Sequence, residues 1–435
     1  NSRIKRFYNS IMVKSNLINY SSFSKSPIIA ALDIGSSKIC CLIAKIDKNE
    51  TLSIIGAGFQ ESKGLVSGVI TDMIALENSI RNCVASAEKM ASVRIKNIIV
   101  GFSSDNINIE NLNIEIDLKG AVIGQRDLNR AYNFLSEKHD MGNRSILHVI
   151  PFQYSIDGNK GVKNPIGMIG DKLGVEISII SSDSNTLKNL ENVVKHCDLE
   201  IDEIVYTPYA SGISLLSEEE KELGVALIDM GSTLTTVSIF YNGSILYTKS
   251  IPLGGNMVTN DVSRIFSLSF ANAERIKIIN GQLIEELENS LSTIEVDTLG
   301  EDNESIEITR KDLISVIKPR IFEIVNTIND IIIDSKYNNI IANRVVITGG
   351  ASQMEGLLDF TSKVFGKKAR LAKSIQINAL PENMKSPSFS AISSMVKYSI
   401  TKNNDINMKL TKKNNNSDSI YAYVQKFKNW FIENF

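Results

Sequence analysis

The sequence has little cysteine and little histidine. Its four cysteines include one adjacent pair, Cys40 and Cys41, and no C-x-x-C spacing, a pattern that fits neither a disulfide framework nor a zinc site. The three histidines lie near no carboxylate or cysteine cluster with metal-ligand spacing. We therefore expect a chain of the reducing cytosol, with no metal site and no Ser/His/Asp triad built on these residues.

The sequence also lacks a charge excess and long apolar runs. Lysine and arginine number 47 against 49 aspartates and glutamates, and this balance argues against nucleic acid as the main partner. No stretch approaches the roughly 20 uninterrupted apolar residues of a membrane-spanning helix, because Asp33 and Lys38 interrupt the apolar region near the start. Residues 1–27 are rich in serine and asparagine and have basic but no acidic residues, which predicts a disordered basic extension.

What the sequence does contain is an internal repeat. Residues 28–58 and residues 223–255 each hold an apolar strand, the motif Asp-x-Gly-Ser, a second strand, a polar turn and a third strand that ends in glycine. This similarity indicates two halves of one fold. A chain of 435 residues is also too long for one hydrophobic core, so we expect several domains.

The repeated motif predicts a pair of anion-binding hairpins. A glycine after the strand lets the backbone approach a ligand closely and expose its N–H groups. Two facing hairpins could clamp a polyphosphate, with Asp33 and Asp229 holding Mg²⁺ through its waters. One copy alone is common in ordinary β-hairpins, whereas two copies in matching strand contexts are far more specific for a phosphate site. The predicted phosphate-binding residues are Gly35, Ser36, Ser37, Lys38, Gly231, Ser232 and Thr233.

A third motif follows the same logic in residues 344–356, RVVITGGASQMEG. An apolar strand runs into Gly349 and Gly350, where a flat base or a phosphate could lie against bare backbone. Ser352 and Glu355 have the spacing of a capping box, which predicts that a helix begins there.

The order and spacing of these three motifs resemble those of the actin-like ATPase superfamily. The resemblance implies an α/β fold of two lobes with duplicated mixed-sheet cores, ATP and Mg²⁺ as cofactors, and Asp33 and Asp229 as the catalytic and metal-binding residues. A helix resembles the segment whose Glu274 and Lys277 embrace the ribose and the adenine. The alternative for this pair is a surface ion pair with i,i+3 spacing. Two further cofactor-binding residues are implied, Gly255 and Met354.

An insertion narrows the resemblance. Residues 150–154, IPFQY, and residues 164–170, NPIGMIG, are similar to the FtsA family of bacterial cell-division proteins, whose first lobe carries a small inserted domain called 1C. The resemblance implies the following division: lobe-one core (1A) at 28–92 and 181–222, domain 1C at 93–180, lobe-two core (2A) at 223–257 and 330–388, domain 2B at 258–329, and a return to lobe one at 389–400.

The tail predicts a membrane anchor on its own physical chemistry. Residues 401–418 are polar and of low complexity, as in a flexible linker. Residues 419–435 then predict an amphipathic helix with one aromatic-rich stripe, which suits the lipid headgroup boundary. The alternative is a terminal helix docked on the protein body. The stripe consists of Ile420, Tyr423, Val424, Phe427, Trp430 and Phe431.

The resemblance to the FtsA family implies a function. Such a protein would bind ATP, polymerise on the inner face of the cytoplasmic membrane at the division site, tether the FtsZ ring there and recruit later division proteins through domain 1C. The C-terminal tail of FtsZ would dock on domain 2B, at a helix resembling residues 314–323. Lys318 and Arg320 are the candidates to meet this acidic peptide, and the alternative for them is a solvated helix face.

The sequence predicts at most weak ATPase activity. Residues 204–212, IVYTPYASG, offer no carboxylate or amide to orient an attacking water. Three alternatives stay open: a pilus-assembly ATPase, a small-molecule kinase of the same superfamily, and an actin-like body that binds no nucleotide.

Overall fold

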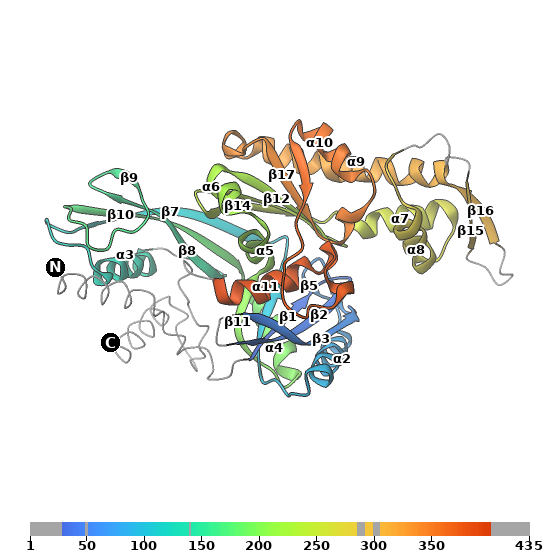
Figure 1. Cartoon of the computed structure of the whole chain (residues 1–435), viewed down its shortest axis with the longest axis horizontal. Coiled ribbons are helices and arrows are strands. Elements are labelled where there is room, and N and C mark those ends of the chain that lie inside the picture. The colour runs from blue at the N-terminus through green and yellow to red at the C-terminus, as the bar shows by residue number, and fades with distance from the viewer. Residues whose placement is uncertain (1–27, 48–50, 139–140, 285–291, 299–304, 402–435) are drawn as a thin grey trace, which may run out of the picture.

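The computed structural model describes residues 28–47, 51–138, 141–284, 292–298 and 305–401. Two lobes lie side by side, with a sheet domain at one end of the molecule and a mainly helical subdomain at the other (Figure 1). The predicted basic extension, the linker beyond residue 401 and the predicted tail helix lie outside the described residues. Within the part that is described, no helix has both the length and the apolar character needed to cross a membrane.

The two lobes contain five-stranded sheets of the same topology, which confirms the predicted duplication. In each sheet the first strand of the repeat pairs antiparallel with the second strand and parallel with a strand from later in the lobe. The sheet of lobe one has the order β11 (Glu200–Tyr206), β6 (Asn97–Phe102), β1 (Ile28–Ile34), β2 (Lys38–Ile46) and β3 (Leu52–Glu61). The sheet of lobe two has the matching order β18 (Lys368–Leu371), β17 (Arg344–Thr348), β12 (Val225–Met230), β13 (Thr235–Tyr241) and β14 (Ser244–Ile251).

Helices cover both faces of these sheets because the central strands are apolar on both faces. In β1, Leu32 joins a core with α2 (Met73–Ala91) and α4 (Ser184–His196), while Ala31 joins a core with α5 (Thr207–Leu215) and α11 (Ser390–Thr401). The second of these cores also contains Leu227 of β12, so the two lobes share it. The outer face of lobe two packs instead against α10 (Leu357–Phe365) and three helices of the subdomain beyond it.

An inserted domain lies between β6 and α4. Its sheet has the order β7 (Ile107–Asp117), β10 (Lys172–Asp183), β8 (Arg144–Ile156) and β9 (Asn159–Val162), and α3 (Gln125–Lys138) packs on it. The predicted start of the insert at residue 93 is wrong, because β6 pairs with β1 and β11 in the sheet of lobe one. The predicted end at residue 180 falls inside β10, whose pairing with β8 continues to Asp183.

The helical subdomain is attached to lobe two. It comprises α7 (Gly255–Phe266), α8 (Phe270–Asn280), the hairpin of β15 (Thr293–Asp297) and β16 (Ser305–Thr309), and α9 (Arg310–Asp334). The predicted boundary at residue 329 cuts α9, whose buried side chains continue to Ile332 in the lobe-two core. A second short hairpin, β4 (Leu65–Val66) and β5 (Val69–Ile70), lies on lobe one.

Within the described residues the chain crosses between the lobes twice. The first crossing is α5 followed by α6 (Glu218–Leu223). The second is the segment after β18, which pairs with β3 of lobe one at Asn378 and then passes through the 3₁₀ turn η4 (Pro387–Phe389) into α11. The helix α11 packs on α5 and on β1 of lobe one (Figure 1), where the return to lobe one is expected.

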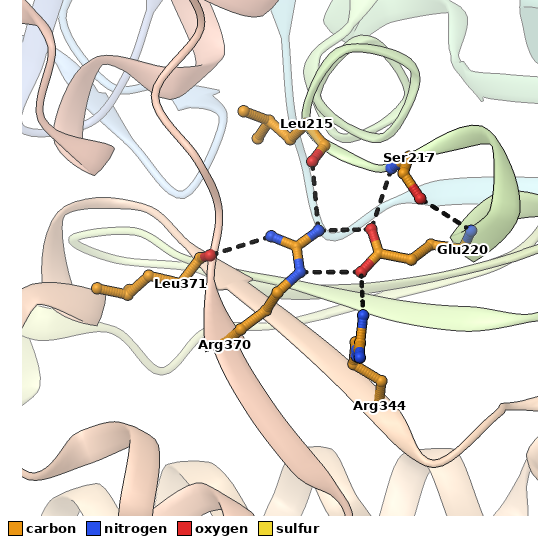
Figure 2. A network of polar contacts seen from close by, with 6 residues as sticks. All are labelled: Leu215, Ser217, Glu220, Arg344, Arg370 and Leu371. Carbon is orange, nitrogen blue, oxygen red and sulfur yellow. Dashed lines mark hydrogen bonds and ion pairs between the residues drawn. The ribbon is translucent and has the colours of Figure 1, made fainter.

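A polar network holds the first crossing to lobe two (Figure 2). Glu220 of α6 accepts hydrogen bonds from Arg370 of β18, with Nε at 2.9 Å from Oε1 and Nη2 at 2.5 Å from Oε2. The backbone N–H of Ser217 donates to Glu220 at 3.0 Å, and Arg344 Nη1 lies 3.5 Å away. Burial alone would raise the pKa of Glu220, but Arg370 and the Ser217 N–H outweigh it and hold this pKa below its usual value.

Candidate nucleotide-binding site

The two Asp-x-Gly-Ser motifs form hairpins of the same geometry. In the first, the Gly35 N–H donates to the Lys38 carbonyl at 3.1 Å; in the second, the Gly231 N–H donates to the Leu234 carbonyl at 2.9 Å. Each turn therefore presents two residues at its tip, Ser36 with Ser37 and Ser232 with Thr233, as in a two-residue hairpin. The two hairpins thus have the same backbone hydrogen bond although their tip residues differ.

The aspartates of the two motifs are buried, and the charge of Asp229 acts on Asp33. Burial, and after it the charge of Asp229, raises the pKa of Asp33 to about 6, while Lys38 acts in the opposite direction. Burial raises the pKa of Asp229 to about 6 as well. Two partly desolvated carboxylates that repel one another form a site where a cation relieves an electrostatic penalty. The donor set therefore fits Mg²⁺, which prefers carboxylate and water oxygens.

Asp33 lies against Gly101 of β6, and Asp229 lies against Gly349, which directly follows β17. A Cβ on Gly349 would lie 2.4 Å from Asp229 Oδ1 and 2.5 Å from the Met230 carbonyl oxygen, and the φ of Gly349 is +90°. A Cβ on Gly101 would lie 3.1 Å from Asp33 Oδ1. Contacts within the protein, with Asp229 and Met230, thus require a glycine at position 349. The equivalent role of Gly101 is a feature that the sequence analysis missed.

The predicted ribose and adenine residues meet the second hairpin at the start of α7. The Gly255 N–H donates to the Gly231 carbonyl at 2.9 Å. Lys277 of α8 donates to the Gly255 carbonyl at 3.1 Å, to Thr259 Oγ1 at 2.8 Å and to Glu274 Oε2 at 2.6 Å. Only 11% of the Lys277 side chain is exposed, and burial lowers its pKa. This pair is therefore built into the subdomain, unlike the surface ion pair considered above.

The third motif lies beside the start of α7, but its helix does not begin where the sequence predicts. Residues Gly350–Gln353 form a 3₁₀ turn, η2, and α10 begins only after Gly356, which has a left-handed backbone. The prediction of a capping box is wrong, because the Ser352 hydroxyl donates its hydrogen bond to the Gly349 carbonyl at 2.7 Å. A Cβ on Gly255 would lie 3.3 Å from that of Ala351 in η2, so the loop and the start of α7 are in contact. Met354 packs against the lobe-two core.

Two family models match the chain. The model described as Cell division protein FtsA matches residues 226–394, and the model described as SHS2 domain inserted in FTSA matches residues 104–181. The Cell division protein FtsA of Agrobacterium fabrum is 35% identical over 389 residues, which cover 87% of this chain and 88% of that protein. The protein of the same description from Pseudomonas aeruginosa is 30% identical over 416 residues, covering 95% and 100%. The chain belongs to the FtsA family.

Solved structures share the fold of this FtsA-family chain at low identity. The PilM-PilN type IV pilus biogenesis complex matches with a TM-score of 0.60 at 12% identity, covering 85% of this chain and 98% of that one. MreB 5 of Spiroplasma citri bound to AMPPNP matches with a TM-score of 0.55 at 14% identity, covering 87% and 98%. The fold is therefore actin-like, with the SHS2 domain of the FtsA family inserted in lobe one.

The first hairpin has backbone and side-chain partners within the FtsA-family chain. Ser36 Oγ accepts a hydrogen bond from the Ser67 N–H at 3.0 Å, and the Ser37 carbonyl accepts one from the Ser62 N–H at 3.0 Å. The Lys38 Nζ lies 3.7 Å from the ring centroid of Phe389 in η4. The contact of Phe389 with this hairpin was missed by the sequence analysis, since 351 positions along the chain separate Lys38 from Phe389.

The two candidate partner-binding residues lie on α9, which is helical as predicted. Arg320 is held by Asp261 of α7, with Nε at 2.6 Å from Oδ2 and Nη2 at 3.2 Å from Oδ1, and it also contacts Glu323. Its charge is therefore already paired within the subdomain. Lys318, one helical turn before Phe322, is half-buried, and Phe322 is 53% exposed.

Proposed function

We propose that this FtsA-family chain binds Mg·ATP between its lobes. The observation that carries the proposal is the symmetric pair of hairpins whose aspartates, Asp33 and Asp229, lie at the ends of equivalent strands and repel one another. In this proposal the hairpin N–H and hydroxyl groups contact the phosphates, and Asp33 and Asp229 hold Mg²⁺ through its waters. Glu274 and Lys277 contact the ribose and the adenine beside Gly255, and the backbone at Gly349 and Gly350 flanks the base.

We propose at most weak ATPase activity. An efficient hydrolase needs a group that orients the attacking water, and α5, which follows β11, offers the hydroxyls of Thr207 and Ser211 but no carboxylate or amide. Nucleotide binding would then act through the shape of the subunit more than through turnover.

We propose, as the family resemblance implies, that the protein is a peripheral membrane adaptor of cell division. It would polymerise on the cytoplasmic face of the inner membrane, with the tail stripe as its lipid anchor, and would tether FtsZ to that surface. One short amphipathic helix binds lipid only marginally. Linking many such anchors in one filament raises the apparent affinity by about 10² to 10⁴, so polymerisation would control membrane attachment.

The helical subdomain is the proposed docking site for the FtsZ tail. Lys318 and the exposed ring of Phe322 lie on one stretch of α9, which suits a peptide with both acidic and apolar residues. Because Arg320 is already paired with Asp261, we give it the role of fixing α9 against α7. Recruitment of later division proteins is proposed for the inserted domain.

Two alternatives compete with the adaptor. A pilus-assembly ATPase shares the fold, as the similarity to the PilM-PilN complex illustrates, but at 12% identity that similarity carries no function. A small-molecule kinase would need a catalytic base facing its acceptor, and among the residues that the structure describes we identify no aspartate in such a context beyond Asp33 and Asp229.

The proposal is tested by titrating Mg·ATP into the intact chain and by liposome flotation. We expect ATP binding that Asp229→Asn removes, and flotation that increases with ATP together with filaments seen by electron microscopy. A chain stopped after Lys402 should bind ATP equally well but stay in solution. Absence of ATP binding by the intact chain would refute the nucleotide site, and equal flotation of the two chains would refute the anchor.

A further inference from the structure

A 3₁₀ turn between the second crossing and α11, η4 (Pro387–Phe389), contacts both lobes at the candidate nucleotide site. This turn is called the strap below. On the lobe-two side, Gln353 Nε2 of η2 donates to Ser388 Oγ at 2.8 Å, and a Cβ on Gly350 would lie 3.4 Å from the same oxygen. On the lobe-one side, Phe389 lies against Lys38 of the first hairpin. The strap thus contacts both the adenosine loop and the phosphate hairpin.

The ring of Phe389 is held in place by its surroundings. Phe59 of β3 meets it edge-on, with ring centroids 5.9 Å apart and an interplanar angle of 73°. The ring also packs against the core that the two lobes share. An aromatic ring fixed in this way offers its negative face to a cation at a defined position.

The ammonium group of Lys38 needs such a partner. Burial lowers the pKa of Lys38, while the carboxylate of Asp33 acts to raise it. A lysine side chain has much rotamer entropy. If that entropy is lost when the ligand binds, the affinity is lower than when the side chain is already ordered in the free protein.

We propose that Phe389 is a positioning residue of the nucleotide site, whose ring holds the Lys38 ammonium at the first hairpin ready for a nucleotide phosphate. This inference rests on the proposed nucleotide binding. The ring contacts no nucleotide itself; it restrains Lys38 before and after the phosphate binds. Because the strap contacts both lobes, the position of the Lys38 ammonium, and with it the affinity for phosphate, depends on the arrangement of the lobes.

The test is calorimetric titration of Mg·ADP into the full chain. We expect Phe389→Leu to weaken ADP affinity by about 2- to 10-fold, the equivalent of ordering one long side chain on binding, and Phe389→Tyr to keep the wild-type affinity. In the Lys38→Met background, Phe389→Leu should have no further effect, because the ring acts only through the ammonium. Phe322→Leu is the matched control, since that ring has a similar edge-on contact with Phe360 at 6.0 Å but lies on α9.

A second measurement keeps the proposal falsifiable if Phe389→Leu folds poorly. With lysines labelled by ¹³C-methylation, the methyl signal that disappears in Lys38→Arg should be shifted upfield by the ring in both the free and the ADP-bound wild type. A signal that returns to the unshifted position with ADP would overturn the proposal, as would unchanged or tighter ADP binding by Phe389→Leu. If the wild type binds no ADP, the proposed function itself is refuted and this inference falls with it.

Discussion

Replacing Arg370 by leucine tests whether the Glu220 network stabilises the junction of the lobes. Glu220 has 10% of its side chain exposed and accepts two charge-assisted bonds from Arg370, which is itself 25% exposed. Removing one partner of a fully buried pair costs about 3–5 kcal/mol. Because Arg370 is partly solvated and the Ser217 N–H remains, we expect Arg370→Leu to lower the free energy of unfolding by about 2 kcal/mol.

The assay is urea unfolding at pH 7, followed by far-UV circular dichroism. Arg344→Leu is the matched control, since it removes a 3.5 Å contact to the same carboxylate from a side chain that is 54% exposed. Exposed pairs contribute little, so this variant should lose less than about 0.5 kcal/mol. Equal losses in the two variants would refute the reasoning.

The pH dependence gives a second check on the same variant. The pKa of Glu220 lies below its usual value of 4.5 in the folded state, so its stabilising contribution is present above that value and is lost as the pH falls through the folded pKa. The difference between wild type and Arg370→Leu should therefore shrink below pH 4.5. A difference that stays constant down to pH 3 would mean that Arg370 acts by packing and not by charge.

Three other predictions concern the candidate site and its surroundings. Without ligand, Asp33→Asn should stabilise the fold by about 3 kcal/mol at pH 7, because the folded pKa is raised from 3.8 to about 6; the gain should fade between pH 6 and pH 4 in urea titrations, and its absence at pH 7 would contradict the assignment. Gly349→Ala should lower the free energy of unfolding by about 1–3 kcal/mol through overlap with Asp229 and the left-handed backbone, whereas Gly350→Ala, with its Cβ 3.4 Å from Ser388 Oγ, should leave the stability nearly unchanged; equal losses of stability in the two variants, measured by urea unfolding, would contradict this geometry. Tyr206→Phe removes a buried hydrogen bond of 2.7 Å to Thr248 and should cost about 1 kcal/mol in thermal unfolding, an expectation that an unchanged melting temperature would defeat.

The sequence predicts the hairpins well because everything that they need is local. An apolar strand, a glycine and an immediate return strand leave few other conformations for residues such as Asp33 and Gly35. The duplication then follows from comparing two short segments. The matching register, in which Asp33 pairs with Cys40 and Asp229 with Thr236, is what such a comparison predicts.

Features that depend on distant segments were not predictable in this way. Gly101 is needed because Asp33, Thr207 and Met395 converge on it, and no local pattern signals that. The capping box failed because Ser352 finds a nearer acceptor in the Gly349 carbonyl once the chain forms a 3₁₀ turn. The start of the insert was predicted too early because the sequence of a buried apolar strand such as β6 does not indicate to which sheet the strand belongs.

The paired crossings have a mechanical consequence. Two connections define a line, so we expect the easiest relative motion of the lobes to be a rotation about an axis through α5 and the segment after β18, beside the core that both lobes share. Displacement grows with distance from such a pivot. The inserted domain and the helical subdomain lie at opposite ends of the molecule (Figure 1), like the two tips of a pair of levers. A ligand that changes the angle between the hairpins by a small amount would therefore move these two ends the most, and a filament that repeats the subunit would add up the change along its length.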